Sequence, residues 1–282
     1  DRAAADWTQI ATWADMGVTE DFYVYMDGSS WWSGIHGLLQ SPTWGRADYK
    51  LIGPADTSGN YEAWLDASLD DRDHIYIHTA DRRVTGADPE ADGKYFRFYG
   101  ASAFNPGRGT YHFSYYGNHE YYEEHYIQGY VGWVPYLTVH EMDMLKAEAA
   151  IRNGDKATAV ALINPYRTAN GELDPIDTSL DIGDSEDLMD ANPYTGGLGN
   201  SLWAVFKYEK RIELYHKGVG IAWTDKRGWG TLPTGTVLYF PIPGDELDIL
   251  LMDNYTFGGV GNEGGAPKLA PRDLPGNPPP RF

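Results

Sequence analysis

The segment PYLTVHEMDMLKAEAAIRNGDKATAVALINPYRTANG, Pro135 to Gly171, decides the fold of the second half of the chain. Its apolar residues recur three and four positions apart, which predicts a helix from about Tyr136 to Arg152. Asn153-Gly154 is a stop signal, and Asp155 is the N-cap of a second helix that we expect to end near Asn164. The two helices should form a hairpin. The expected contact residues are Leu137, Met144, Ala147 and Ile151 on the first helix and Ala157, Val160, Ala161 and Ile163 or Asn164 on the second.

Helical spacing appears on both sides of this hairpin. Ala5 to Met16 is predicted to be an amphipathic helix, and Ser201 to Lys217 another, whereas Phe22 to Met26 is typical of a short strand. We therefore expect a mainly α-helical protein in three parts. These are a loop-rich aromatic subdomain with one N-terminal helix and a few short strands (residues 1–134), a helical region (135–250) and a Gly/Pro-rich extended tail (251–282). The inner face of the 201–217 helix is expected to be Leu202, Val205, Phe206, Ile212 and Tyr215.

Composition limits the classes of function. The chain has 282 residues, of which 41 are acidic and 22 basic, so its net charge of −19 repels nucleic acid and anionic membranes. The absence of cysteine excludes disulfides and thiol catalysis within this stretch. The sequence has no run of eighteen apolar residues, so it predicts no membrane-spanning helix. The first residues, DRAAADWTQ, contain no initiator Met and no lipid-accepting Cys, so we expect a processed or partial product.

Aromatic residues are the candidate binding groups. The stretch GTYHFSYYGNHEYYEEHYIQGYVGW, Gly109 to Trp133, contains nine aromatic residues and three histidines without Lys or Arg. Its first part alternates, with Tyr111, Phe113 and Tyr115 predicted to be the inward face of a strand. Sugar rings pack on aromatic faces, so exposed Trp and Tyr near polar groups predict a glycan site. The candidates are Trp31 and Trp32 in the turn DGSSWWSG, Trp44, and Tyr121, Tyr122 and Tyr126. A core role for part of this set stays an open alternative.

Four blocks in one order carry a family resemblance. They are EMDMLKAEAAIRNGD with the A, IN, R and G that follow it up to Gly171, YEKRIELYHKG, WTDKRGWG and FPIPGDEL, and together they resemble the C-terminal half of the SusD/RagB family of outer-membrane nutrient-binding proteins. DASLDDRD, Asp66 to Asp73, is similar to an Asp-x-Arg turn of the same family. Within the blocks, the residues that the resemblance marks as structural are Glu148, Arg167, Glu209, Arg211, Glu213, Trp223, Asp225 and Arg227. The i, i+4 spacing of Glu209 and Glu213 puts two acids on one helix face, where we expect ion pairs that hold the fold.

The resemblance implies a fold and a function. It implies a tetratricopeptide-like helical superhelix that supports a loop-rich subdomain and performs no catalysis. It also implies binding of a glycan or similar polar nutrient on the extracellular face of the outer membrane, for delivery to a TonB-dependent transporter. Family members are longer than this chain, so the remaining helical repeats and the lipidated cysteine are expected outside this stretch, or the subunit is completed by a neighbour.

Two other classes of function and two kinds of metal site stay open as alternatives. One class is a structural surface protein that assembles with a neighbouring subunit; the other is a carbohydrate-active hydrolase that uses acidic pairs such as Glu123 and Glu124.

We expect no cofactor. The histidines, among them His74 with His78 and His119 with His125, lack the spacing of a zinc enzyme. Hard oxygen ligands for calcium are offered by Asp66, Asp70, Asp71 and Asp73, although a solvated acidic loop is favoured there.

Overall fold

The computed structural model describes residues 5–68, 71–100, 113–185, 201–217, 221–231 and 242–253. The chain divides into two compact units. The larger is formed by Asp6–Val219, and the smaller by Asp1–Ala5 with Gly220–Phe282. Where the sequence predicts a mainly α-helical protein, the described residues form a mixed fold with 45% helix and two small antiparallel sheets.

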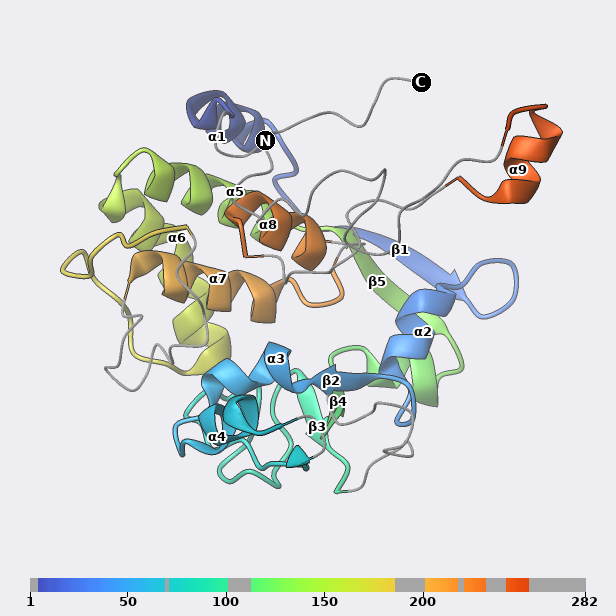
Figure 1. Cartoon of the computed structure of the whole chain (residues 1–282), viewed down its shortest axis with the longest axis horizontal. Helices are drawn as coiled ribbons and strands as arrows, with labels where there is room; N and C mark the ends of the chain where they lie inside the picture. The colour runs from blue at the N-terminus through green and yellow to red at the C-terminus, as the bar shows by residue number, and fades with distance from the viewer. Residues whose placement is uncertain are drawn as a thin grey trace. The chain divides into compact units, whose positions relative to one another are not determined.

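Helices form one side of the larger unit (Figure 1). Helix α1 (Trp7–Asp15) packs on α5 (Val139–Arg152), α5 forms a hairpin with α6 (Lys156–Gly171), and α7 (Leu202–Glu213) contacts both α5 and α6. The predicted helices at the N-terminus, at the hairpin and after Ser201 are therefore confirmed. Within the described residues these helices do not repeat as a superhelix.

The first helix of the hairpin begins later than the sequence predicts. Tyr136 and Leu137 belong to strand β5 (Val131–Leu137), which pairs with strand β1 (Phe22–Asp27). Leu137 is the partner of Phe22, and Tyr136 lies at an irregularity in the register. The helix begins after Thr138, whose hydroxyl oxygen accepts the Glu141 N–H at 3.2 Å as an N-cap. Leu137 is exposed, so its predicted place in the hairpin contact was wrong.

The second helix of the hairpin ends later than predicted. Asp155 caps it as expected, but α6 continues through Pro165 to Gly171 and ends where Glu172 adopts a left-handed conformation. The buried side chains of α6 are Ala159, Ile163 and Arg167. The predicted stripe through Ala157, Val160 and Ala161 was therefore misplaced, because a buried contact of Arg167 described below sets which side of α6 faces inward.

Two small sheets complete the larger unit. Strands β1 and β5 pair antiparallel, and β4 (Phe113–Asn118) lies between β2 (Arg46–Asp48) and β3 (Phe96–Phe98). The strand predicted around Phe113 is confirmed, but its inward face is Ser114 and Tyr116, with Tyr115 only half-buried. Tyr111 lies outside the described residues.

Short helices and aromatic rings build the core beside β4. The helices are α3 (Tyr49–Ile52), η2 (Gly53–Ala55) and α4 (Asn60–Asp66), whereas α2 (Gly34–Gln40) contributes no residue to this core. Two buried phenol groups hold the loop after α4. Tyr49 donates to the Ile75 carbonyl at 3.0 Å, and Tyr116 accepts the Ile77 N–H at 3.0 Å. The hydroxyl groups of these buried rings thus provide hydrogen-bond partners for backbone groups that have no strand beside them.

The smaller unit contains α8 (Ile221–Trp229) and α9 (Gly244–Ile249). Residues 254–282, which include most of the predicted tail, lie outside the described residues. Across the described part of both units, no helix has the length and apolar character needed to cross a bilayer.

Candidate ligand-binding site

Four of the six predicted binding residues are well exposed. The exposed fractions are 39% for Trp31, 46% for Trp32, 59% for Trp44 and 53% for Tyr126. Tyr121 and Tyr122 are half-buried. The structure thus offers indole and phenol faces to solvent, instead of placing the whole set in the core.

A hydrogen-bonded turn presents Trp31 and Trp32. The Asp27 carboxylate accepts the N–H groups of Ser29, Ser30 and Trp31 at 2.9, 2.7 and 3.0 Å. The Trp31 N–H contributes most to lowering the pKa of Asp27 below its ordinary value, since these bonds favour the charged carboxylate. The turn is therefore held by its own residues, and both indoles stay half-exposed.

The neighbouring rings come from η6 and the segment after it. Helix α2 contacts η6 (Glu123–Ile127), which in turn contacts β5. Trp32 packs on Tyr130 with ring centroids 4.6 Å apart, and Tyr122 stacks on Tyr126 at 5.0 Å. The turn after β1 and the η6 segment are thus linked through aromatic contacts, although the sequence separates them by about ninety residues.

The sheet β1–β5 adds exposed rings that the sequence analysis did not single out. Tyr25 pairs with Trp133 in the antiparallel register, and their rings meet edge to face at 5.1 Å. Both side chains are exposed. We call Tyr25, Trp31, Trp32, Trp44, Tyr126 and Trp133 the aromatic surface residues. The alternation in FYVYM (residues 22–26) and VGW (131–133) is the sequence signal that could have indicated this exposed aromatic face.

A polar cavity of about 320 Å³ lies in the larger unit beside this sheet. Tyr23 of β1, Pro135 of β5 and Tyr121 are among its lining residues, and Tyr23 is also exposed at the surface. The remaining lining residues are Asp21, Tyr95, Glu120, Thr138, Val139, His140, Tyr166, Asn170, Glu213 and Lys217. Of the predicted binding residues, only Tyr121 lines the cavity.

Charged groups of the cavity are held in place by hydrogen bonds. Lys217 Nζ lies 2.8 Å from a Glu120 carboxylate oxygen and donates to the Glu213 carbonyl at 2.6 Å. The Tyr121 hydroxyl donates to Glu120 at 3.3 Å. Asp21, which directly precedes β1, accepts the Val139 N–H at 2.8 Å.

His140 is the neutral member of the cavity lining. It stacks on Tyr166 with ring centroids 3.4 Å apart and planes 8° apart. Burial, reinforced by the positive charges of Lys217 and Arg83, lowers the pKa of His140 to about 2. The imidazole therefore carries no charge at neutral pH, and its Nδ1 lies 3.6 Å from Glu213.

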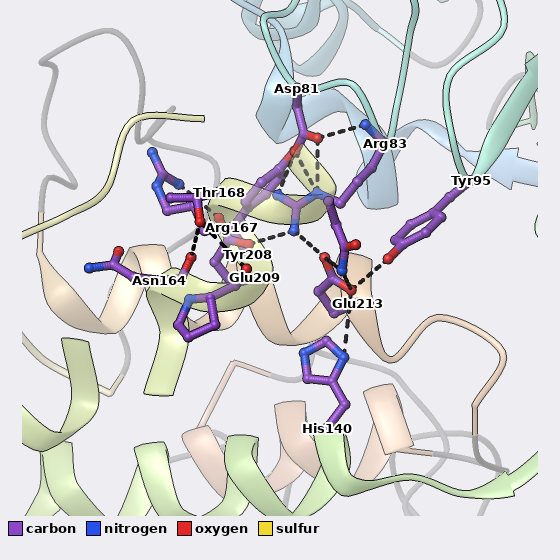
Figure 2. Close-up of polar contacts among 12 residues, drawn as sticks. Asp81, Arg83, Tyr95, His140, Asn164, Arg167, Thr168, Tyr208, Glu209 and Glu213 are labelled. Carbon is purple, nitrogen blue, oxygen red and sulfur yellow. Dashed lines mark hydrogen bonds and ion pairs between the residues drawn. The ribbon is translucent and has the colours of Figure 1, made fainter. Parts of the chain in front are cut away.

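A buried ion network lies behind Glu213 (Figure 2). The Arg83 guanidinium reaches Asp81 at 2.7 Å, Glu209 at 2.6 Å and Glu213 at 2.8 Å, and all four side chains are fully buried. Arg167 from α6 reaches the second oxygen of Glu209 at 2.7 Å. Glu209 and Glu213 thus connect α7 to α6 and to the loop that carries Arg83.

Glu213 collects further donors. The Tyr95 hydroxyl donates to it at 2.7 Å (Figure 2). The Asn170 amide lies 3.1 Å from the same oxygen. Burial raises the pKa of the Glu213 carboxyl, while Arg83 and Tyr95 act in the opposite direction. Within this cluster, the sequence analysis named Glu209, Glu213 and Arg167 but missed Asp81, Arg83, Tyr95 and Asn170, which lie in segments without a distinctive local pattern.

The other residues assigned a structural role also have defined contacts. Glu148 is buried and pairs with Arg152 at 3.1 Å and with Lys210 at 3.5 Å. Arg211 donates to the Lys50 carbonyl at 2.7 Å. In the smaller unit, Asp225 is buried and the Arg227 guanidinium lies 5.3 Å from the centre of the Trp223 ring.

Metal ligands do not cluster in the described part of the chain. There, no group of three or more His, Asp or Glu side chains is arranged to hold an ion. Asp71 accepts the Ser68 hydroxyl at 2.7 Å, and Asp73 accepts the His74 N–H at 2.7 Å. Asp70 lies outside the described residues.

No protein family model, no curated protein and no solved structure matches the chain.

Proposed function

We propose that the chain is a non-catalytic binding protein that holds a glycan, or a similar polar nutrient, on its aromatic surface residues. One observation carries this proposal: exposed Trp and Tyr side chains lie on the β1–β5 sheet, on the turn that follows β1, and on η6, which contacts β5. Rings on ordered segments bind flat C–H faces at a low entropic cost, and nearby polar groups bind hydroxyls. The acidic charge of the chain favours a neutral or cationic ligand.

The proposed setting is the extracellular face of the outer membrane, where the protein would deliver its ligand to a TonB-dependent transporter. Its support is the four ordered blocks that resemble the SusD/RagB family. The proposal takes the hairpin of α5 and α6 as one tetratricopeptide-like unit and includes a superhelix built when further hairpins stack on it. The partners proposed are the transporter and a further helical half or neighbouring subunit.

A titration tests the binding function. Soluble oligosaccharides of different linkage are added to the protein while tryptophan emission is recorded, and the same samples are assayed for reducing ends. We expect saturable quenching by at least one saccharide and no product. If no saccharide changes the emission while the protein forms large assemblies, the structural role replaces this proposal.

A second candidate function is supported by one feature of the cavity. Glu120 and Glu213 both line it, and burial raises the pKa of Glu213, as in the acid of a glycoside hydrolase pair. Under this candidate, reducing ends appear on incubation and disappear in Glu120→Gln. The four hydrogen-bonding and ionic partners of Glu213 favour a structural role instead.

A further inference from the structure

We infer that the polar cavity beside the β1–β5 sheet binds one sugar unit and selects against units that carry negative charge. This inference rests on the proposed function and adds a second site and a ligand class to it. The cavity would hold a neutral or amine-bearing unit, while the aromatic surface residues hold the rest of the glycan.

Size and position suit a single unit. Ligand cavities of proteins commonly measure about 300–1,000 Å³, so a cavity of about 320 Å³ lies at the lower end of that range. Tyr23 connects the cavity to the aromatic surface residues, because it lines the cavity, is itself exposed, and is two positions from Tyr25 on β1. A chain of sugars lying on the sheet could therefore place one end in the cavity.

The polar groups match the hydroxyls of a sugar. Each hydroxyl can donate and accept, so it pairs both with carboxylates and with phenol or amide groups. The cavity offers carboxylates from Asp21 and Glu120, and phenol groups from Tyr23, Tyr121 and Tyr166. These groups come from the start of β1, from the segment between β4 and η6, and from α6. The Tyr23 hydroxyl donates to Asp21 and the Tyr121 hydroxyl to Glu120, while the Tyr166 hydroxyl donates to Asp143 outside the lining, so all three phenols are oriented before a ligand arrives.

Charge supplies the selectivity. Asp21, Glu120 and Glu213 bring three carboxylates to the lining, against one ammonium from Lys217. Lys217 is already paired with Glu120, and Arg83 pairs with Glu213 from behind the wall. His140 adds no positive charge, since burial keeps it neutral. An entering carboxylate would therefore meet Asp21 without a free cation opposite it, whereas an amine would be attracted.

The test uses three small probes: methyl β-glucoside, methyl β-glucosaminide and methyl β-glucuronide. Their affinities are measured by ligand-observed NMR titration at pH 7.5. We expect the glucuronide to bind about tenfold more weakly than the glucoside, and the glucosaminide to bind at least as well as the glucoside. Equal or tighter binding of the glucuronide, or no binding of any probe, overturns the inference.

Variants link the selectivity to the cavity. Glu120→Gln leaves the charge of Lys217 unopposed, so the disadvantage of the glucuronide should shrink to about threefold or less. Glu90→Gln is the matched control, because Glu90 is exposed and is not among the residues that line the cavity, so the selectivity of this variant should not change. Tyr121→Phe removes one hydroxyl only and should weaken all three probes alike. An unchanged preference in Glu120→Gln, with circular dichroism showing an intact fold, contradicts the inference.

The outcomes separate this inference from the proposed function. Oligosaccharide binding that is lost in Trp31→Ala/Trp32→Ala but unchanged in Glu120→Gln and Tyr121→Phe leaves the aromatic site standing and rejects the cavity. If the three probes bind in the expected order but no oligosaccharide changes the emission of the indoles, the cavity site stands and the aromatic site is rejected.

Discussion

Arg83 is the residue on which the interior of the larger unit depends most. A single guanidinium bridges Asp81, Glu209 and Glu213, which come from two distant parts of the chain, and none of the four side chains contacts solvent. The spacing of Glu209 and Glu213 predicted paired acids on one helix face. It could not say which cation pairs with them, because Arg83 lies 126 positions before Glu209.

Replacing Arg83 should therefore be costly. Arg83→Met leaves three buried carboxylates short of a partner, and breaking a buried ion pair from one side costs about 3–5 kcal/mol. We expect the urea midpoint to fall sharply, with the unfolding free energy lowered by that amount. Arg97→Met is the matched control, since Arg97 and Asp92 form a partly exposed pair at 3.5 Å that should contribute no more than about 1 kcal/mol. Similar losses in both variants would argue against the network.

His140 makes stability depend on pH. Its pKa is about 2 in the fold, against about 6.5 in an unfolded chain, so only the unfolded state takes up this proton between those values. The fold is thus fully stable with respect to His140 above pH 6.5, and it loses about 1.4 kcal/mol per pH unit as the pH falls below that. Chemical denaturation of wild type and His140→Gln at pH 7, 6 and 5 measures this. In the variant, the unfolding free energy should fall less steeply with decreasing pH, by the equivalent of one proton taken up on unfolding. An identical slope in both proteins would show that His140 protonates in the fold.

At the scale of elements, the junction of β5 and α5 shows what local pattern can and cannot predict. Helical spacing identified α5 correctly, because its apolar positions and its Asn153-Gly154 stop are local signals. The start was misplaced because Tyr136 and Leu137 continue the apolar pattern although they belong to β5, which pairs with β1 more than a hundred residues away. The end of α6 was misplaced for a similar reason, since the Arg167–Glu209 contact lies beyond the reach of a local pattern.

Thr138 is expected to fix where α5 begins. Thr138→Ala removes the hydroxyl that accepts the Glu141 N–H and should lower the unfolding free energy by about 1 kcal/mol. Thr138→Ser keeps the acceptor oxygen and should recover most of this loss. Thermal unfolding of the two variants measures the difference. Equal melting temperatures would mean that pairing of β5 with β1, and not the cap, determines the helix start.

At the scale of the whole molecule, composition and pattern predicted the helical side and the strand at Phe22–Met26, but not the pairing of that strand with β5, on which the exposed rings depend. The excess of acid, the lack of cysteine and the hairpin are readable in the sequence. The meeting of Trp32 with Tyr130, and of Tyr25 with Trp133, depends on strand register and on the packing of α2 against η6. The exposure of these rings on neighbouring elements is therefore a property of the tertiary fold, even though each ring was visible as a candidate or as part of an alternating pattern.

The most direct measurement of that property is calorimetric titration of three proteins with an oligosaccharide that quenches wild-type emission. They are the wild type, Trp31→Ala/Trp32→Ala and the control Trp13→Ala, which removes from α1 an indole that is more exposed than Trp31 or Trp32. Loss of two stacking rings should weaken binding about tenfold or more, whereas Trp13→Ala should bind like the wild type. Unchanged affinity in the double variant, with its fold intact, would contradict the claim that these rings hold the ligand.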